Sequence, residues 1–294
     1  MAEQAPFDDR DGFIWMNGRM VPWREAKLHV LTHALHYGSA VFEGERVYGG
    51  KIFKLGEHLD RLYDSAHAIL LTIPIPKEEM AEITEEAVRR SGIAEAYIRH
   101  VVTRGVGDLG LDPRKCARPT TIIIVDTIRL WPEEVYETGL KVVTAGTPIP
   151  QRESLSPRVK SLNYLAHILA KIEGIQAGAD EVIMLDSAGS VAEGSGQNLF
   201  VVKQGTVRTP PPFAGILKGV TRDVVMELAR GAGYDMQESM LNRYDLYTAD
   251  EAFLTGTATE LIAIRQADGR VIGTGKAGPV TRDLRARFQA LVRS

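Results

Sequence analysis

Short apolar runs with the period of strands alternate with amphipathic helical segments along the whole chain, and this alternation restricts the fold more than any other feature. Asn17 and Gly18 stand between strand-like runs at 13–16 and 19–21. They predict a tight hairpin, because both residues tolerate positive φ angles. The other elements expected in the first half are a second hairpin at 41–55, helices at 59–70 and 76–92, and strands at 96–103 and 120–125.

The second half repeats this mixture of elements. Strands are expected at 141–145, 181–186, 198–202 and 252–255, and helices at 162–173, 220–232 and 279–291. A chain of 294 residues with this pattern predicts an α/β (α+β) fold of two domains, with the ligand in a cleft between them. We expect a small N-terminal domain at 1–128, a proline-marked interdomain loop at 129–139 and a larger C-terminal domain at 140–294.

Charge and cysteine usage narrow the classes of partner. The 35 basic and 38 acidic residues give a net charge of -3 and form no basic stripe, so no nucleic-acid partner is expected. The single cysteine, Cys116, can form no internal disulfide and supplies too few thiolates for a zinc or iron–sulfur centre, so no metal is expected. No run approaches the ~18 apolar residues of a membrane span, and no apolar signal core opens the chain. We expect a cytoplasmic enzyme with no membrane partner.

Two patterns resemble binding motifs but are better explained structurally. The stretch 105–110 satisfies G-x-G-x-x-G, yet the residues after it break a helix instead of starting one, which favours a glycine-rich loop over a nicotinamide site. An oxidoreductase built on this loop is the alternative from another enzyme class. His29, His33 and His36 have helical spacing, but no carboxylate follows before Glu43, so a structural role is favoured over a metal site.

Lys160 is the first candidate catalytic residue. It directly precedes the helix expected at 162–173, with Ser161 or Asn163 as candidate caps and Tyr164 one turn further on. The positive end of a helix dipole disfavours a cation, and Schiff-base chemistry needs a neutral amine. The alternative is a solvated lysine before a capped helix.

Glu193 is the second candidate, a carboxylate in a glycine-rich turn before a strand. A pyridoxal ring withdraws electrons only while its nitrogen stays protonated, which requires an adjacent carboxylate. The alternative is an exposed turn glutamate. Two segments offer N–H groups and hydroxyls to a phosphate, the helix start at 219–222 and the polar turn at 255–259, and Arg61 could add a cation. Ordinary caps and turns have the same appearance.

Tyr97 and Arg99 alternate on an expected strand and therefore point to one face. An arginine beside a tyrosine is a natural carboxylate receptor, although an ordinary surface strand face fits the same residues.

Together these motifs follow one order along the chain: HYG at 36–38, VFEG at 41–44, RL at 61–62, AYIR at 96–99, Lys160 with NYL at 163–165, EGSGQNLF at 193–200, GVTR at 219–222 and GTA at 256–258. In this order they resemble the motifs of class IV (fold type IV) aminotransferases, and most closely those of branched-chain-amino-acid aminotransferases. The similarity runs from about residue 13 to the C-terminal helix.

The resemblance implies pyridoxal 5'-phosphate as the cofactor, carried as a Schiff base on Lys160, which is the implied catalytic residue. Glu193 would keep the pyridine nitrogen protonated, and Tyr164 would bind the phenolic oxygen. The other implied cofactor-binding residues are Arg61, Val220, Thr221 and Thr257 at the phosphate and Leu217 against the ring. The implied substrate-binding residues are Thr257 and Ala258 for the α-carboxylate, Tyr97 and Arg99 for the side-chain carboxylate of glutamate, and Tyr37, Phe42, Gly44 and Leu111 around an apolar pocket.

The implied reaction moves the amino group between branched-chain L-amino acids (Leu, Ile, Val) and 2-oxoglutarate. Tyr37 and Leu111 would come from a neighbouring subunit, which implies a homodimer at least. The alternatives with the same fold are a D-amino-acid or (R)-amine transaminase and an aminodeoxychorismate lyase. His100 stands where branched-chain enzymes usually have proline, and Glu45 where many have isoleucine. Ile128, Leu130 and Trp131 stand in place of an expected aromatic pair.

Overall fold

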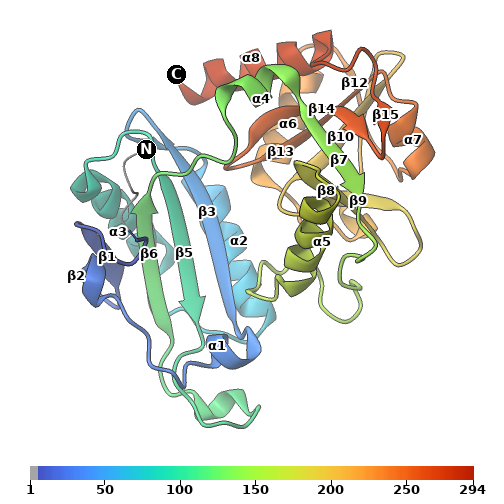
Figure 1. The fold of residues 1–294 in the computed structure, drawn as a ribbon. Helices are drawn as coiled ribbons and strands as arrows, with labels where there is room; N and C mark the ends of the chain where they lie inside the picture. Colours follow the sequence, from blue (N-terminus) through green and yellow to red (C-terminus); the bar gives the residue numbers. More distant parts are fainter. Residues whose placement is uncertain (1–5) are drawn as a thin grey trace. The chain divides into compact units, whose positions relative to one another are not determined.

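The computed structural model describes residues 6–294, so the first five residues of the expected N-terminal domain lie outside the described residues. The described chain forms two compact units (Figure 1). The first contains residues 6–128 and 159–163, and the second contains 129–158 and 164–294. The short segment 159–163 therefore belongs with the first unit although the chain around it belongs to the second.

The first unit is built on an antiparallel six-stranded sheet in the order β2-β1-β6-β5-β3-β4. Its elements are β1 (Phe13–Met16), β2 (Arg19–Pro22), η1 (Trp23–Glu25), α1 (His33–Tyr37), β3 (Ala40–Tyr48), β4 (Lys51–Ile52), α2 (Leu55–Ala68), α3 (Lys77–Ser91), β5 (Tyr97–Thr103), η2 (Pro113–Lys115) and β6 (Thr120–Asp126). Asn17 and Gly18 have φ angles of 48° and 91°, which confirms the turn that the sequence predicts between β1 and β2.

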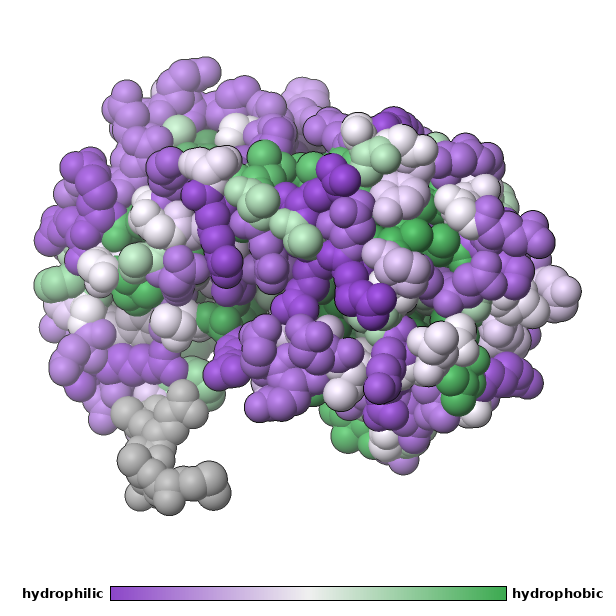
Figure 2. Space-filling model, turned by 90° about the horizontal axis from the view of Figure 1, so that it is seen from above, coloured by the Kyte–Doolittle hydropathy of each residue, from purple (hydrophilic) through white to green (hydrophobic). Residues whose placement is uncertain are grey.

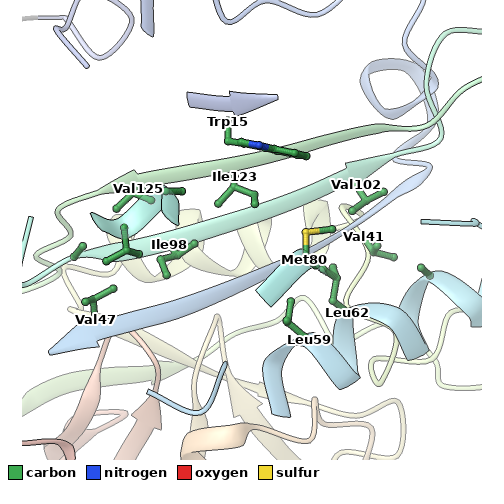
Figure 3. Close-up of a cluster of buried hydrophobic side chains, with 14 of the residues drawn as sticks. Trp15, Val41, Val47, Leu59, Leu62, Met80, Ile98, Val102, Ile123 and Val125 are labelled. Carbon is green, nitrogen blue, oxygen red and sulfur yellow. The ribbon is translucent and has the colours of Figure 1, made fainter. Parts of the chain in front are cut away.

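Helices α2 and α3 cover one face of this sheet (Figure 1). Leu59 and Leu62 of α2 and Met80 of α3 are almost completely buried there (Figure 3). They pack against the alternate strand residues Val41, Val47, Ile98, Val102, Ile123 and Val125. Because side chains alternate along a strand, Phe42 and Gly44 of β3 and Tyr97 and Arg99 of β5 lie on the opposite face of the sheet.

The second unit contains a nine-stranded sheet that closes on itself. Strand β9 pairs with both β8 and β10, so that β10-β13-β14-β7-β8-β9 form a ring, with β11 and β12 extending from β10. The elements are α4 (Glu133–Thr138), β7 (Leu140–Thr144), α5 (Leu165–Gln176), β8 (Glu181–Leu185), β9 (Val191–Gly194), β10 (Asn198–Lys203), β11 (Thr206–Thr209), η3 (Pro212–Ala214), α6 (Val220–Gly231), β12 (Asp235–Glu238), α7 (Arg243–Tyr247), β13 (Glu251–Gly256), β14 (Glu260–Ala267), β15 (Arg270–Val271) and α8 (Pro279–Val292).

Lys160 does not directly precede a helix, which corrects the sequence expectation. Helix α5 begins at Leu165, its N-cap is Tyr164, and no side chain caps it. Residues 159–163 instead extend along the edge of β3, where Ser161 forms a bridge with Val41. Backbone pairing with β3 thus takes Leu162 and Asn163 out of the helix that the apolar spacing predicts at 162–173.

The apolar side of α5 faces outward. Leu165 and Ile175 are 66% and 65% exposed, whereas Ala170 and Gly174 lie on the buried side against β8. Elsewhere, on the face that Figure 2 shows, hydrophilic residues predominate and hydrophobic areas are small. Among residues 6–294, no helix combines the length and the apolarity that a membrane span requires.

The buried packing of α2 should dominate the stability of the first unit. Replacing Leu62, which is fully buried, by alanine should lower the free energy of unfolding by about 2–5 kcal/mol, because it leaves a cavity in the core. The control Leu70→Ala, at a side chain that is 84% exposed, should change it by less than about 0.5 kcal/mol. Denaturant unfolding of both variants measures the difference, and equal losses would contradict this account of the core.

Candidate active site

In the first unit, the backbone of Lys160 is held from two sides. Its carbonyl accepts a hydrogen bond from the Phe42 N–H at 3.0 Å, and its own N–H donates to Ser65 Oγ of α2 at 3.1 Å. The Lys160 Nζ lies 4.5 Å from the centre of the Phe42 ring. These hydrogen bonds fix the main-chain position of Lys160, and from that position the side-chain amine lies against the Phe42 ring.

A second cation, the guanidinium of Arg99, also lies against the Phe42 ring. The Arg99 guanidinium carbon lies 4.8 Å from the centre of the Phe42 ring and 5.4 Å from that of Tyr97, and its Nη2 donates to the Tyr97 hydroxyl at 3.3 Å. Gly44 pairs with Arg99 across β3 and β5, and a methyl group at Gly44 would overlap the Tyr97 phenol oxygen. Glycine at position 44 therefore lets the Tyr97 ring lie on the strand. The structure brings together Lys160 and four of the expected substrate-binding residues.

Burial raises the pKa of the Tyr97 hydroxyl, and the carboxylates of Glu45 and Glu43 raise it further, whereas the charge of Arg99 opposes them. The phenol therefore keeps its proton at neutral pH. It remains able to donate one hydrogen bond while it accepts another from Arg99.

Arg61, expected to bind phosphate, is held by a buried carboxylate that the sequence analysis did not select. Its Nε and Nη2 donate to Glu43 Oε1 and Oε2 at 2.6 and 2.9 Å, and His58 Nδ1 lies 2.8 Å from Glu43 Oε2. Burial alone would raise the pKa of Glu43, but the charge of Arg61 and the hydrogen bonds from His58 and Arg61 hold it below its ordinary value. Glu43 lies two residues from Val41 on β3, so strand alternation in the sequence already places it on the core face.

The three spaced histidines bond to the main chain. His33 Nε2 lies 2.8 Å from the Asp108 carbonyl and His36 Nε2 2.7 Å from the Val30 carbonyl, while His29 Nδ1 accepts from the Leu31 N–H. His29 lies outside α1, so the three do not share one helix.

The glycine-rich loop at 105–110 leads into the short 3-10 helix η2 and not into an α-helix, as the sequence indicates. The Tyr37 hydroxyl donates to the Leu109 carbonyl of this loop. Tyr37 and Leu111 are 37% and 78% exposed, so both present apolar surface at the end of the unit.

In the second unit, Glu193 is a buried strand residue and not an exposed turn residue, which corrects the expected location. It lies in β9 and is 6% exposed. Its Oε2 accepts hydrogen bonds from Asn198 Nδ2 at 3.0 Å and from the Leu217 N–H at 3.1 Å. Asn198, which the sequence analysis did not select, also donates to the Leu217 carbonyl at 2.9 Å and so fixes the orientation of the carboxylate.

Of the two segments expected to bind phosphate, the helix start has the expected structure, whereas the turn is shorter than expected because Thr255 and Gly256 belong to β13. Helix α6 begins at Val220, and Thr221 in its first turn is 4% exposed. A side chain at Gly219 would overlap Asn198 Oδ1, so this glycine lets the start of α6 approach the strand that carries Asn198. The start of the helix is therefore linked, through Asn198, to the position of Glu193.

The other segment is the turn at 257–259, which joins β13 to β14 and contains Thr257 and Ala258. It begins beside the turn that connects β9 with β10, because Gly256 approaches Gly196 and Gln197. The Oγ1 of Thr255 is buried and has no hydrogen-bond partner within the described part of the chain. Tyr164 lies at the start of α5, where its ring stacks on His167 at 4.4 Å.

Comparison with known proteins assigns this arrangement to a family. Residues 40–267 match the family described as amino-transferase class IV, and this span covers most of the chain. The chain belongs to the class IV aminotransferases. The membership confirms both the family that the ordered motifs indicate and the α/β fold class.

Relatives of this class IV aminotransferase match it over nearly their whole lengths. A Methanocaldococcus jannaschii protein, provisionally named a branched-chain-amino-acid aminotransferase, is 48% identical over 94% of this chain and 95% of its own. The branched-chain-amino-acid aminotransferase of Pseudomonas aeruginosa is 43% identical over 97% of this chain and 94% of that protein. The crystal structure of the Escherichia coli branched-chain amino acid aminotransferase gives a TM-score of 0.94 at 35% identity, over 96% of this chain and 95% of that one.

The buried ion pair of Glu43 with Arg61 should contribute stability that depends on pH. Because folding lowers the pKa of Glu43 from 4.5, its contribution is complete above that value and declines as the pH falls through the folded-state pKa. Glu43→Gln should lower the free energy of unfolding by about 3 kcal/mol at neutral pH, since it leaves the Arg61 charge uncompensated.

The difference between Glu43→Gln and wild type should shrink below about pH 4.5. The exposed pair of Glu57 with Lys54 supplies the control, and Glu57→Gln should cost less than about 1 kcal/mol. Unfolding curves between pH 3 and pH 8, measured for both variants, test this; a pH-independent difference would contradict it.

Proposed function

We propose that this enzyme moves the amino group between branched-chain L-amino acids (Leu, Ile, Val) and 2-oxoglutarate, with pyridoxal 5'-phosphate as its cofactor. The observation that carries the proposal is the shared face of β3 and β5, where an amine, an aromatic wall and a guanidinium lie together. Relatives that match nearly the whole chain carry the name of this activity. Solved relatives of the same name contain pyridoxamine 5'-phosphate or N-(5'-phosphopyridoxyl)-L-glutamate.

The donor groups of this chain fit the proposed cofactor. A buried carboxylate held in one orientation suits a protonated pyridine nitrogen, and we assign Glu193 to it. The start of α6 offers N–H groups and the Thr221 hydroxyl to a phosphate, and the turn at 257–259 offers Thr257. We assign Leu217 to the ring face, Tyr164 to the phenolic oxygen, and Arg61 and Val220 to the phosphate.

When bound, pyridoxal phosphate supplies an electron sink that stabilises negative charge at the substrate α-carbon. We assign Lys160 as the residue that carries the cofactor and as the base whose Nζ removes the proton from the α-carbon of the amino donor. In the second half-reaction the same Nζ would deliver a proton to the α-carbon of the amino acid formed from the 2-oxo acid. The carboxylate of Glu193 holds the proton at the pyridine nitrogen. Thr257 and Ala258 bind the substrate α-carboxylate.

One pocket must bind both an apolar and a negatively charged substrate side chain. Leucine needs an apolar surface, which we assign to Phe42, Gly44, Tyr37 and Leu111. The second carboxylate of glutamate needs a partner, because an unpaired buried carboxylate would cost several kcal/mol. We assign that partner to Arg99, held by Tyr97.

We further propose a homodimer that works in the cytoplasm. The exposed Tyr37 and Leu111 support the assignment of these residues to the pocket of a neighbouring subunit. The outward apolar side of α5 also supports self-association, since contiguous exposed apolar surface usually marks an interface.

Lys160→Ala should abolish cofactor attachment and reduce kcat by about 10³-fold or more, because it removes the amine that we assign as the base. In wild type, borohydride reduction followed by peptide mass spectrometry should find the cofactor covalently attached to Lys160, and the purified protein should be yellow. The exposed Lys27→Ala is the control and should retain colour and turnover. A colourless wild type that gains no visible absorption from added pyridoxal phosphate would refute the proposal.

Arg99→Ala should lower kcat/KM for L-glutamate by roughly 10–100-fold, because the side-chain carboxylate loses a charged hydrogen-bond partner. The value for L-leucine should change much less. Arg114→Ala is the control, because the Arg114 side chain is 87% exposed and pairs with Asp112 at the surface. Equal losses for both substrates would remove Arg99 as the anchor. The same assay with D-alanine and (R)-1-phenylethylamine tests the alternative substrate classes, and a preference for either over L-leucine would overturn the proposed specificity.

A further inference from the structure

A buried polar chain lies on the core side of the same two strands, outside the proposed binding surface. Glu45 Oε1 lies 2.9 Å from His100 Nδ1, and His100 Nε2 lies 2.9 Å from Thr84 Oγ1. All three residues are 0% exposed. The chain therefore connects β3, β5 and α3 through side chains within the hydrophobic core.

The hydrogen bonds determine how many protons this chain holds. Thr84 donates its single hydroxyl proton to the Met80 carbonyl at 2.6 Å, so its oxygen must accept from His100, and His100 Nε2 carries a proton. One further proton must lie between His100 Nδ1 and Glu45, because two lone pairs would repel each other at 2.9 Å. The Glu45–His100 pair is therefore neutral overall and joined by a shared proton.

This pair lies directly behind the proposed substrate anchor. Glu45 follows Gly44 in β3 and His100 follows Arg99 in β5, and Gly44 and Arg99 are partners in the register. Successive side chains of a strand point to opposite faces of the sheet. Glu45 and His100 therefore lie on the core face, and each is one residue along its strand from Gly44 or Arg99 on the other face. Glu45 is opposite Ile98, so its bond to His100 runs diagonally and resists sliding of one strand along the other.

Stability alone does not account for these residues in the core. The Oε2 of Glu45 is buried and has no hydrogen-bond partner among residues 6–294, which leaves a desolvation cost. A pair of apolar side chains would cover the same face without that cost, and such replacements are often neutral or stabilising. What an apolar pair cannot supply is a directional bond that fixes the offset between β3 and β5.

We propose that Glu45, His100 and Thr84 are positioning residues that hold Arg99 in place and thereby set the preference for glutamate over aliphatic substrates. This inference rests on the proposed role of Arg99. A shift of β5 against β3 moves the start of the Arg99 side chain directly. It affects an aliphatic substrate less, because apolar contacts depend weakly on direction.

The test compares kcat/KM for L-glutamate and for L-leucine in Glu45→Leu, His100→Leu and the double variant. Each single change should lower the glutamate-to-leucine ratio roughly tenfold, and the double variant should lower it no further, because the bond is already lost. Glu45→Gln should keep the ratio within about twofold, since its amide can donate to His100 Nδ1 while Nε2 still donates to Thr84. Ile98→Val, on the same core face of β5, is the control for general loosening and should leave the ratio unchanged.

A second comparison shows whether the effect passes through Arg99. In an Arg99→Ala background, Glu45→Leu should not change the ratio further. Equal losses for both substrates, a ratio for Ile98→Val as low as that for Glu45→Leu, or a full additional loss in the Arg99→Ala background would each overturn the inference. If Arg99→Ala alone changes the ratio and Glu45→Leu does not, only this inference fails. If Arg99→Ala itself leaves the ratio unchanged, the proposed role of Arg99 fails and this inference fails with it.

Discussion

The antiparallel pairing of β3 with β5 is the constraint on which the first unit depends. Side chains alternate between the two faces of these strands, so one register sets both the core and the proposed binding surface. Val41 and Ile98 pack under α2 and α3, while Phe42 and Arg99 lie on the opposite face. A shift of one residue would exchange these two sets, and the unit would lose its core and the proposed binding surface together.

Two buried glutamates, Glu43 and Glu45, lie among the apolar residues of β3, and the charge of each is compensated in a different way. Glu43 faces a guanidinium that binds both of its oxygens, so it remains ionised. Glu45 instead shares a proton with His100 and forms a neutral pair. Both arrangements avoid an isolated charge in the core, which would cost several kcal/mol. The first fixes Arg61 of α2, and the second fixes β5 and α3.

Much of the fold could be predicted from local pattern, and the failures have a common cause. The hairpin of β1 and β2 is predictable because Asn17 and Gly18 both tolerate the positive φ angles that its turn requires. Local pattern places Glu193 in a turn, because glutamate and glycine are uncommon in strands, yet pairing with β8 and β10 makes it a strand residue. The residues around Lys160 likewise join β3 and not α5. The role of Asn198 cannot be predicted from local pattern, because it depends on contacts with Glu193 on the neighbouring strand β9 and with Leu217, 19 residues further along the chain.

The surroundings of Arg99 suit its proposed place on a surface that accepts both a charged and an aliphatic side chain. No carboxylate among residues 6–294 pairs with it; its contacts are the faces of Phe42 and Tyr97 and the Tyr97 hydroxyl. An aromatic face attracts a guanidinium without neutralising it, so the charge is stabilised when the substrate is aliphatic and is still available when it carries a carboxylate. A carboxylate partner from the protein would have competed with glutamate. The aromatic contacts therefore suit the proposed role of Arg99, which serves two kinds of substrate in turn, better than an ion pair would.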